Sequence, residues 1–366
     1  MTVITTARRV KNAVSNIIVT PIKTTESKVS INKNEFLFYS NSPEKVYEKD
    51  LADNGKWLCR EMVKGNGQVY TWHENGCSTA ITSIILLHNP NNFSVNVTAS
   101  NIGKSNLTNW QSDILGWQDY FTAGKTYTET IPAGGYTNFF SQVIPSGEGH
   151  VFGIVSRLSV TDTNGSPASV QLFDLVYADV NKSGNASSCA DRDDESTLRR
   201  RGLGAGFYQQ INFQPLEIAN NDFMGFKLGS KNDFFNGEDL IQIADSSGTA
   251  VDNNLFGNYG VQLEVNMTVK NTGAGGNFAV FYGSNGGACF PFVCYNGAFG
   301  KPTYGSYYGG IGIKDVDAKA PNGGYSYADI LDLGWIEAGA SLDKISFFTS
   351  LTAMGSSPLV LGIRRI

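Results

Sequence analysis

The sequence predicts an all-β fold of two tandem antiparallel β-sandwiches, jelly-roll-like, that follow an N-terminal arm. Forty-one glycines and a charged fraction of only 17% in 366 residues are typical of strands joined by tight turns, since helices are richer in Ala, Leu, Glu and Lys. Apolar and polar residues also alternate over many short stretches. This indicates half-buried strands, because successive side chains point to opposite faces of a sheet.

The individual strands follow this alternation along the chain. In the first half it predicts strands at residues 83–90, 93–101, 126–132, 150–160 and 169–180. In the second half it predicts strands at residues 222–229, 259–271, 277–283, 344–353 and 358–366. Turn-forming Gly, Asn and Pro separate these stretches. Short helices are expected only near residues 7–17 and around residues 110–115.

The order of these stretches predicts the domain organisation. A chain of 366 residues exceeds the usual size of one domain. Both halves run through an extended aromatic segment, a long strand pair that turns at asparagine, and a closing strand pair, which indicates an internal duplication. We therefore expect an arm at residues 1–28, a first sandwich at 29–185, a linker at 186–206 and a second sandwich at 207–366.

The predicted linker contains the stretch "CADRDDESTLRRRGLGAG", in which charge rises and apolar content falls. Its clustered carboxylates could hold a calcium ion, but the neighbouring arginines compete for them and the EF-hand pattern is absent. We therefore interpret the stretch as a solvated joint and expect no metal site.

The N-terminal arm carries Arg8, Arg9 and Lys11 and has no acidic residue before Glu26, so its local charge is positive. It is interpreted either as a mobile tail or as an assembly arm that docks on a neighbouring subunit or on a polyanion. The net charge of the chain is −5, which gives no basic surface for phosphate groups. Nucleic acid is therefore expected as a partner only through this arm.

The N-terminus lacks a continuous apolar segment and a small-residue cleavage site, so it does not have the pattern of a secretory signal. No apolar run approaches the roughly 20 residues that a membrane span needs. We therefore expect no membrane span. Synthesis in the cytoplasm followed by assembly into a surface layer, an inclusion or a virion is the expected localisation.

Five cysteines leave several interpretations open. Cys59 could bridge Cys77 between neighbouring strands, and Cys289 could close a short loop with Cys294. The cysteines, including Cys189, could instead be buried free thiols or form bridges between subunits. No CxxC spacing or nearby histidine points to zinc, and no cofactor is expected.

No pattern in the sequence points to catalysis. The histidines, His73, His88 and His150, lie in or beside apolar strands, where packing and surface roles are the usual ones. A GxSxG nucleophile turn is absent. We therefore expect no catalytic residue and a chain that is not an enzyme.

Tyrosines cluster in the stretch "YGSYYGG", where Tyr304, Tyr307 and Tyr308 lie among glycines. Three interpretations remain open: burial in a sandwich core, contacts between subunits, or stacking against the sugar rings of a glycan. Stacking on single-stranded nucleic acid is disfavoured, because basic residues do not accompany these rings.

The stretch "NSPEKVYEKDLADNGKWLCREMVKGNGQVYTWHENG", residues 41–76, followed by "ILLHNPNNFSVNVT", resembles repeated β-sandwich surface proteins of Firmicutes. The resemblance covers about the first 180 residues and implies sandwich domains with no established catalytic residues to carry over. Such proteins normally begin with a secretion signal, and its absence here puts ordinary secretion in doubt. In architecture alone, the tandem layout is also similar to double jelly-roll capsid proteins.

Together these observations predict a non-catalytic structural protein that assembles with copies of itself into a coat, fibre or shell, as a spore or cell-surface layer or a viral capsid. An exposed strand edge can accept a strand from another chain through main-chain hydrogen bonds, without any special residue. The alternative is a carbohydrate- or receptor-binding β-sandwich, lectin-like or part of a toxin, with a glycan as partner.

Overall fold

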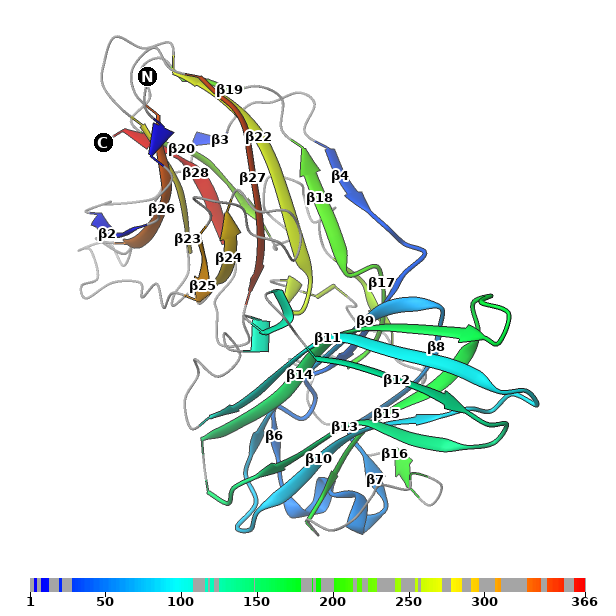
Figure 1. Cartoon of the computed structure of the whole chain (residues 1–366). Coiled ribbons are helices and arrows are strands. Elements are labelled where there is room, and N and C mark those ends of the chain that lie inside the picture. The colour runs from blue at the N-terminus through cyan, green and yellow to red at the C-terminus, as the bar shows by residue number, and fades with distance from the viewer. Residues whose placement is uncertain are drawn as a thin grey trace. The chain divides into compact units, whose positions relative to one another are not determined.

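In the computed structural model, the regular elements of the described residues are almost all β-strands (Figure 1), with two short 3-10 helices, η1 (Glu48–Asp50) and η2 (Ala52–Asn54), which confirms the all-β prediction. In the described part of the chain, no helix is long and apolar enough to cross a membrane. The described residues are 3–4, 8–12, 20–21, 28–107, 116–117, 119–121, 125–147, 149–178, 186, 189–191, 201–212, 216–218, 223–228, 241–244, 254–255, 258–271, 278–284, 291–295, 307–310, 328–336, 341–351 and 359–365.

The chain forms two compact units. The first unit comprises residues Asn32–Phe207 and Ile241–Asn254, and the second comprises Met1–Ile31, Tyr208–Leu240 and Leu255–Ile366. Every strand that the alternating pattern predicts overlaps a strand of one of these units. The alternation of apolar and polar residues therefore located these strands correctly.

The first unit contains an eight-stranded and a four-stranded sheet. The eight-stranded sheet has the order β12-β11-β14-β9-β5-β17-β21, with β6 also paired to β9. Its strands are β5 (Phe36–Ser40), β6 (Lys45–Val46), β9 (Asn66–Asn75), β11 (Val95–Leu107), β12 (Lys125–Ile131), β14 (His150–Asp162), β17 (Arg201–Ala205) and β21 (Ile243–Ala244). The four-stranded sheet has the order β13-β10-β15-β8. Its strands are β8 (Cys59–Lys64), β10 (Ile81–His88), β13 (Tyr136–Ile144) and β15 (Ser169–Tyr177).

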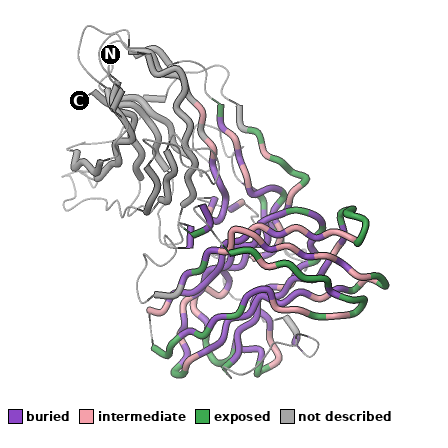
Figure 2. Tube along the Cα trace, in the orientation of Figure 1, coloured by how far each residue is buried: buried purple, intermediate pink, exposed green. Residues whose placement is uncertain are grey.

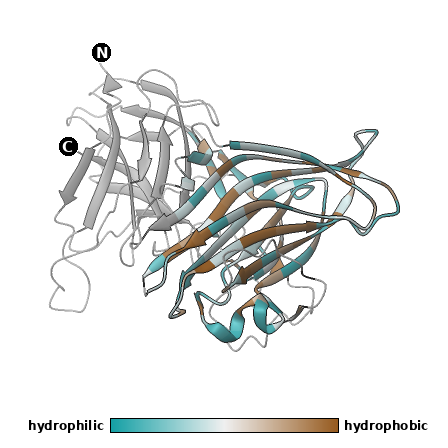
Figure 3. Cartoon of the chain, turned by 60° about the horizontal axis from the view of Figure 1, so that its bottom comes forward, coloured by the Kyte–Doolittle hydropathy of each residue, from teal (hydrophilic) through white to brown (hydrophobic). Residues whose placement is uncertain are grey.

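These two sheets enclose the core of the first unit. Phe38, Val69 and Ile154 of the eight-stranded sheet pack with Leu87 and Leu172 of the four-stranded sheet, and all five are at most 2% exposed. Figure 2 shows buried residues concentrated along these strands, and Figure 3 shows the hydrophobic residues among them. The first unit is therefore a β-sandwich.

The four-stranded sheet is also covered on its outer face. Ile84 and Phe173 pack there in a second buried cluster with Trp57 and Cys189. The rings of Trp57 and Phe173 meet edge-on, with centroids 6.0 Å apart. Trp57 belongs to β7 (Lys56–Trp57), which pairs in parallel with β16 (Ala190–Asp191). Cover on both faces explains the continuous apolar run in β10, because such a strand has no polar face.

The linker prediction is wrong at its C-terminal end. Residues Arg201–Ala205 form β17, which pairs antiparallel with β5 and β21. Gly204 permits this packing, because a Cβ at this position would come within 2.8 Å of the side chains of Ile241 and Ile243. The glycine that was interpreted as part of a joint thus allows a close approach between strands. Residues 192–200 of the linker lie outside the described residues.

The second unit contains two seven-stranded sheets. One has the order β1-β26-β23-β28-β20-β3, with β2 paired to β26. Its strands are β1 (Val3–Ile4), β2 (Arg8–Asn12), β3 (Thr20–Pro21), β20 (Phe223–Leu228), β23 (Phe278–Ser284), β26 (Ala328–Ile336) and β28 (Leu359–Arg365). The other has the order β25-β24-β27-β22-β18-β4, with β19 paired to β22. Its strands are β4 (Lys28–Ile31), β18 (Tyr208–Asn212), β19 (Leu216–Ile218), β22 (Gln262–Asn271), β24 (Pro291–Tyr295), β25 (Tyr307–Gly310) and β27 (Ser341–Leu351).

The same strand order occurs in both units. The row β12-β11-β14-β9-β5-β17 corresponds to β25-β24-β27-β22-β18-β4, and β13-β10-β15-β8 corresponds to β26-β23-β28-β20. Most pairs are antiparallel, and one parallel pair recurs at the same place in both units, since β5 pairs in parallel with β9 and β18 with β22. This repetition agrees with the repeated order of features in the sequence. The finer jelly-roll assignment stays a prediction.

The two repeats exchange their first strands. β4 precedes β5 in the sequence but pairs with β18, whereas β17 precedes β18 but pairs with β5. Each unit is therefore completed by a strand that the sequence places at the start of the other repeat. Alternation identifies a strand without identifying its partner, so the sequence alone does not reveal this exchange.

The predicted arm contributes strands to the second unit. β1 and β2 pair with β26, and β3 pairs with β20. The helix expected near residues 7–17 is wrong over β2, because a short pattern cannot distinguish helix from strand and sheet pairing satisfies the backbone here. The helix expected around residues 110–115 lies outside the described residues.

Candidate functional site

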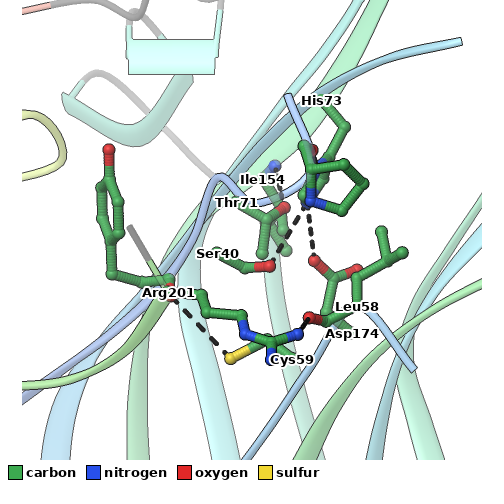
Figure 4. Close-up of polar contacts among 10 residues, drawn as sticks. Ser40, Leu58, Cys59, Thr71, His73, Ile154, Asp174 and Arg201 are labelled. Carbon is green, nitrogen blue, oxygen red and sulfur yellow. Dashed lines mark hydrogen bonds and ion pairs between the residues drawn. The ribbon is translucent and has the colours of Figure 1, made fainter. Parts of the chain in front are cut away.

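A hydrogen-bonded cluster of Ser40, His73 and Asp174 lies inside the first unit (Figure 4). The Nε2 atom of His73 lies 2.9 Å from Oδ2 of Asp174 and 3.3 Å from Oγ of Ser40. Ser40 belongs to β5 and His73 to β9 of the eight-stranded sheet, whereas Asp174 belongs to β15 of the four-stranded sheet. The cluster therefore connects the two sheets across the core.

The imidazole ring of His73 carries a proton on Nδ1. This atom lies 2.6 Å from the carbonyl oxygen of Pro43. Because a carbonyl oxygen only accepts hydrogen bonds, Nδ1 is the donor. Nε2 faces the carboxyl group of Asp174, and the two form a charge-assisted hydrogen bond when Nε2 is also protonated.

The cluster differs in geometry from a catalytic triad. In a triad, the nucleophile and the carboxylate bind opposite nitrogens of the imidazole, whereas Ser40 and Asp174 share Nε2 of His73. All three side chains are fully buried. This arrangement provides a polar connection between the two sheets.

Arg201 and Cys59 adjoin the cluster (Figure 4). Nη1 of Arg201 donates to the carbonyl oxygen of Leu58 over 2.9 Å, and the backbone N–H of Leu58 donates to the carbonyl oxygen of Asp174. Burial raises the pKa of the Cys59 thiol well above its usual range, nearby carboxylates add to the shift, and Arg201 opposes it in part. Cys59 is therefore held as a neutral thiol.

Sequence reasoning gave His73 a packing or surface role and did not single out Ser40, Asp174 or Arg201. The available signal was a lone aspartate inside the apolar stretch "QLFDLVY". A charge at the centre of a buried strand has to be paired, but its partner lies 101 residues away. A local pattern contains no information about that distance.

A second polar centre, Asn89, closes one end of the sandwich. Its buried Nδ2 donates to the carbonyl oxygens of Phe93, Ile131 and Pro132 over 2.8 to 3.0 Å. Its Oδ1 accepts from the backbone and the side chain of Asn91. The side chain thus ties the turn after β10 to the end of β12, which gives the "NPNN" motif a structural role.

Three cysteines, Cys59, Cys77 and Cys189, are buried free thiols. The possible disulfide between Cys59 and Cys77 does not form, because the two free thiols lie in separate core clusters. Cys289 lies outside the described residues. Cys294 lies in β24, where only the backbone is described, so its pairing stays a prediction.

The other predicted site residues belong to the second unit. β2 contains Arg8, Arg9 and Lys11 and pairs with β26 of the same chain. β25 contains Tyr307 and Tyr308, whereas Tyr304 lies outside the described residues. Their roles in assembly or glycan binding stay predictions. Among the described residues, no group of three or more His, Cys, Asp or Glu side chains could hold a metal ion.

A second candidate site is an open strand edge of the first unit, formed by β12 and β13, which we call the β12–β13 edge. In the described part of the chain, β12 pairs only with β11, and β13 pairs only with β10. The two strands also contact each other, since the hydroxyl of Tyr127 lies 2.8 Å from that of Thr137. Two large hydrophobic side chains are exposed on β13: Tyr136 at 43% and Val143 at 50%.

Comparisons with known proteins give little information about the family of this chain. No protein-family model matches the chain, and no curated protein matches it. A solved structure of oxalate decarboxylase from Bacillus subtilis at pH 4.6 is similar at 11% identity with a TM-score of 0.13, covering 84% of this chain and 71% of that one. A second oxalate decarboxylase structure, on substrate binding mode and reaction specificity, has 10% identity, a TM-score of 0.13, and coverage of 79% and 69%.

The expectation that the chain is not an enzyme is corrected to an open question: the two structures above are those of enzymes, and at a TM-score of 0.13 they indicate neither an activity of this chain nor the lack of one. The non-catalytic part of the functional prediction is therefore withdrawn. Similarity this low assigns no activity, substrate or metal to the chain in its place. The resemblance to surface proteins of Firmicutes stays untested.

Proposed function

We propose that the protein is a structural subunit that assembles with copies of itself into a coat, fibre or shell. The observation that carries the proposal is the β12–β13 edge, where two sheets each end in a strand with one paired side in the described chain. Such an edge binds a strand of another chain through main-chain hydrogen bonds. Copies of one chain present the same edge, so each can supply the strand that the other lacks.

The exposure of β12 supports this role. Of its seven residues, only Ile131 is buried. Monomeric proteins commonly protect an edge strand with a proline, with charged side chains or with a covering loop. β12 contains no proline and most of its side chains are exposed, and its charges, Lys125 and Glu129, have opposite signs. Three of the exposed residues are threonines, which favour strands.

Light scattering coupled to size-exclusion chromatography, followed by negative-stain electron microscopy, tests this function. We expect a mass of two or more chains that rises with protein concentration, and regular particles in the micrographs. A monomer that persists at the highest soluble concentration, without regular particles, contradicts the proposal.

Truncation of residues 1–28 does not isolate this function. β1, β2 and β3 pair with β26 and β20 of the same chain, so their removal uncovers strands of the second unit. A loss of assembly would then have two explanations. Substitution of exposed side chains on β12 alters the β12–β13 edge without this complication.

Glycan binding is the second candidate function, and one observation favours it. The ring of Tyr136 stacks on His88 with centroids 4.2 Å apart, and Nδ1 of His88 lies 2.9 Å from Oε1 of Gln171. An exposed ring beside polar groups is a surface on which a sugar ring can stack. A competable glycan-array signal that is lost in Tyr136→Ala but kept in Tyr47→Ala, another exposed tyrosine, supports this function. An array without signal contradicts it.

A further inference from the structure

β12 (Lys125–Ile131) carries two opposite charges placed symmetrically about Tyr127. Lys125 and Glu129 lie two residues on either side of Tyr127, and both are exposed. Neither has an ion-pair partner among the described residues, although Oε2 of Glu129 accepts a hydrogen bond over 2.7 Å from the hydroxyl of Thr137 in β13. Charges on an edge normally discourage indiscriminate strand pairing. A strand that adds to this edge therefore has to offer complementary charges.

We propose that β12 of one copy pairs antiparallel with β12 of a second copy around a two-fold axis at Tyr127, which joins two eight-stranded sheets into one. The inference rests on the proposed function and identifies the strand contact through which the copies assemble. In this register Lys125 lies opposite the partner's Glu129, and Glu129 lies opposite the partner's Lys125. Each charge meets its opposite, and the symmetry provides two such pairs.

Other registers lack this complementarity. A pairing centred on Thr128 places Lys125 opposite the partner's Ile131. A shift by one residue places Lys125 opposite the partner's Thr130. A strand with two largely exposed faces has little hydrophobic pattern to set its register. The two ion pairs therefore select the register centred on Tyr127.

The two faces of β12 fit this pairing. Tyr127 packs against the core cluster of the first unit, and Glu129, two residues further on, lies on the same face of the sheet. On the opposite face, the hydroxyl of Thr128 lies 3.5 Å from that of Thr98 in β11. The two-fold register places the partner's Thr126 opposite Thr128. A row of hydroxyl side chains then continues across the contact, and Thr–Thr pairs stabilise neighbouring strands.

Charge reversal tests this register in the full-length protein. Lys125→Glu places two carboxylates opposite each other in both halves of the contact, and Glu129→Lys does the same with two ammonium groups. We expect either variant to weaken self-association by about tenfold or more in sedimentation velocity, because the unfavourable pair occurs twice. The double variant K125E/E129K restores opposite charges, so we expect its association to return to within about threefold of the unchanged protein.

Lys33→Glu is the matched control, because it makes the same charge change at an exposed turn between β4 and β5. Rescue in the double variant supports the proposed pairing. If the unchanged protein associates while Lys125→Glu and Lys33→Glu behave alike, or if the double variant stays as weak as the single ones, the register is wrong and self-assembly stands. An unchanged protein that is monomeric at every concentration overturns both the inference and the proposed function.

Discussion

Buried polar side chains in the first unit bind partners from distant parts of the chain. His73 forms a hydrogen bond with Asp174 that joins the two sheets. The side chain of Asn89 donates hydrogen bonds to the backbone carbonyl oxygens of Phe93 and Ile131. A buried polar group that loses its partner costs about 1–3 kcal/mol, and a charged group costs more. These contacts therefore favour one pairing of the strands over alternatives that would leave the same groups unbonded.

The pair of His73 and Asp174 can be tested by a double-mutant cycle. Asp174→Leu leaves a buried imidazole without its carboxylate, so we expect the free energy of unfolding to fall by about 3–5 kcal/mol. Replacing His73 by leucine as well removes the unpaired group, and the double variant should lose clearly less than the sum of the single losses. Urea unfolding followed by tryptophan fluorescence measures these values. Strict additivity would argue against a direct interaction.

Cys77 provides a second test at the scale of one residue. Burial raises the pKa of its thiol to about 11, and the carboxylates of Glu48 and Asp50 add to the shift. Since only the thiolate reacts, and about one such thiol in a thousand is ionised at pH 8, we expect iodoacetamide to label Cys77 about a hundredfold more slowly in the folded than in the unfolded protein. Labelling should accelerate as the pH rises towards this pKa.

Peptide mapping by mass spectrometry resolves each cysteine separately, and the protein in guanidinium chloride is the control. Cys59, whose thiol is also buried with a raised pKa, should be protected in the same way. Equal labelling rates with and without denaturant would show that these sites are open to solvent.

At the scale of elements, β17 shows that a segment with little apolar content can form a strand inside a sheet when it packs closely against its neighbours. Its sequence, RGLGA, contains one large apolar residue, Leu203, opposite Phe38 of β5. The strand is held by pairing on both sides, with β5 and with β21. Glycine at position 204 makes the second pairing sterically feasible. Backbone pairing on both sides and the lack of a side chain at Gly204 therefore stabilise β17, which the hydrophobic pattern of the sequence does not predict.

Gly204→Val tests this packing. The new side chain would collide with Ile241 and Ile243, and we expect overpacking to lower the free energy of unfolding by about 1–3 kcal/mol. Ala205→Val is the matched control, since the neighbouring residue is exposed and should change stability by no more than about 0.5 kcal/mol. Denaturant unfolding compares the two variants. Equal stability would restore the interpretation of this segment as a flexible linker.

At the scale of the whole molecule, the exchange of β4 and β17 makes each repeat depend on the other. β4 completes the sheet that contains β18, although its sequence leads directly into the first unit. β17 completes the sheet that contains β5, although its sequence leads directly into the second unit. A cut between the repeats would therefore leave strand edges unpaired in both halves, in addition to the β12–β13 edge that we propose for assembly.

Splitting the chain tests this dependence. Residues 1–206 and 207–366, produced as two chains in one cell, should purify together, because β1 to β4 of the first piece pair with strands of the second. A first piece shortened to residues 32–206 lacks these strands, and we expect the yield of the complex to fall at least about tenfold. A fragment of residues 207–366 that is soluble, folded and stable alone would contradict the exchange.

The sequence by itself determined the fold class and the places of many strands. The stretches at 83–90, 126–132 and 169–180 differ from β10, β12 and β15 by at most three residues at either end, because alternation with period two is a local property of half-buried strands. The repeated order of features likewise corresponds to a repeated strand order.

Only the tertiary structure decided which strands pair and which buried groups meet. Asp174 finds His73 across 101 residues, a glycine-rich segment becomes β17, and two repeats exchange their first strands. The physical reason is the same in each case. Main-chain hydrogen bonds join any two strands of suitable geometry, so partner choice depends on packing over the whole sheet and on long-range contacts that leave no periodic signal in the sequence.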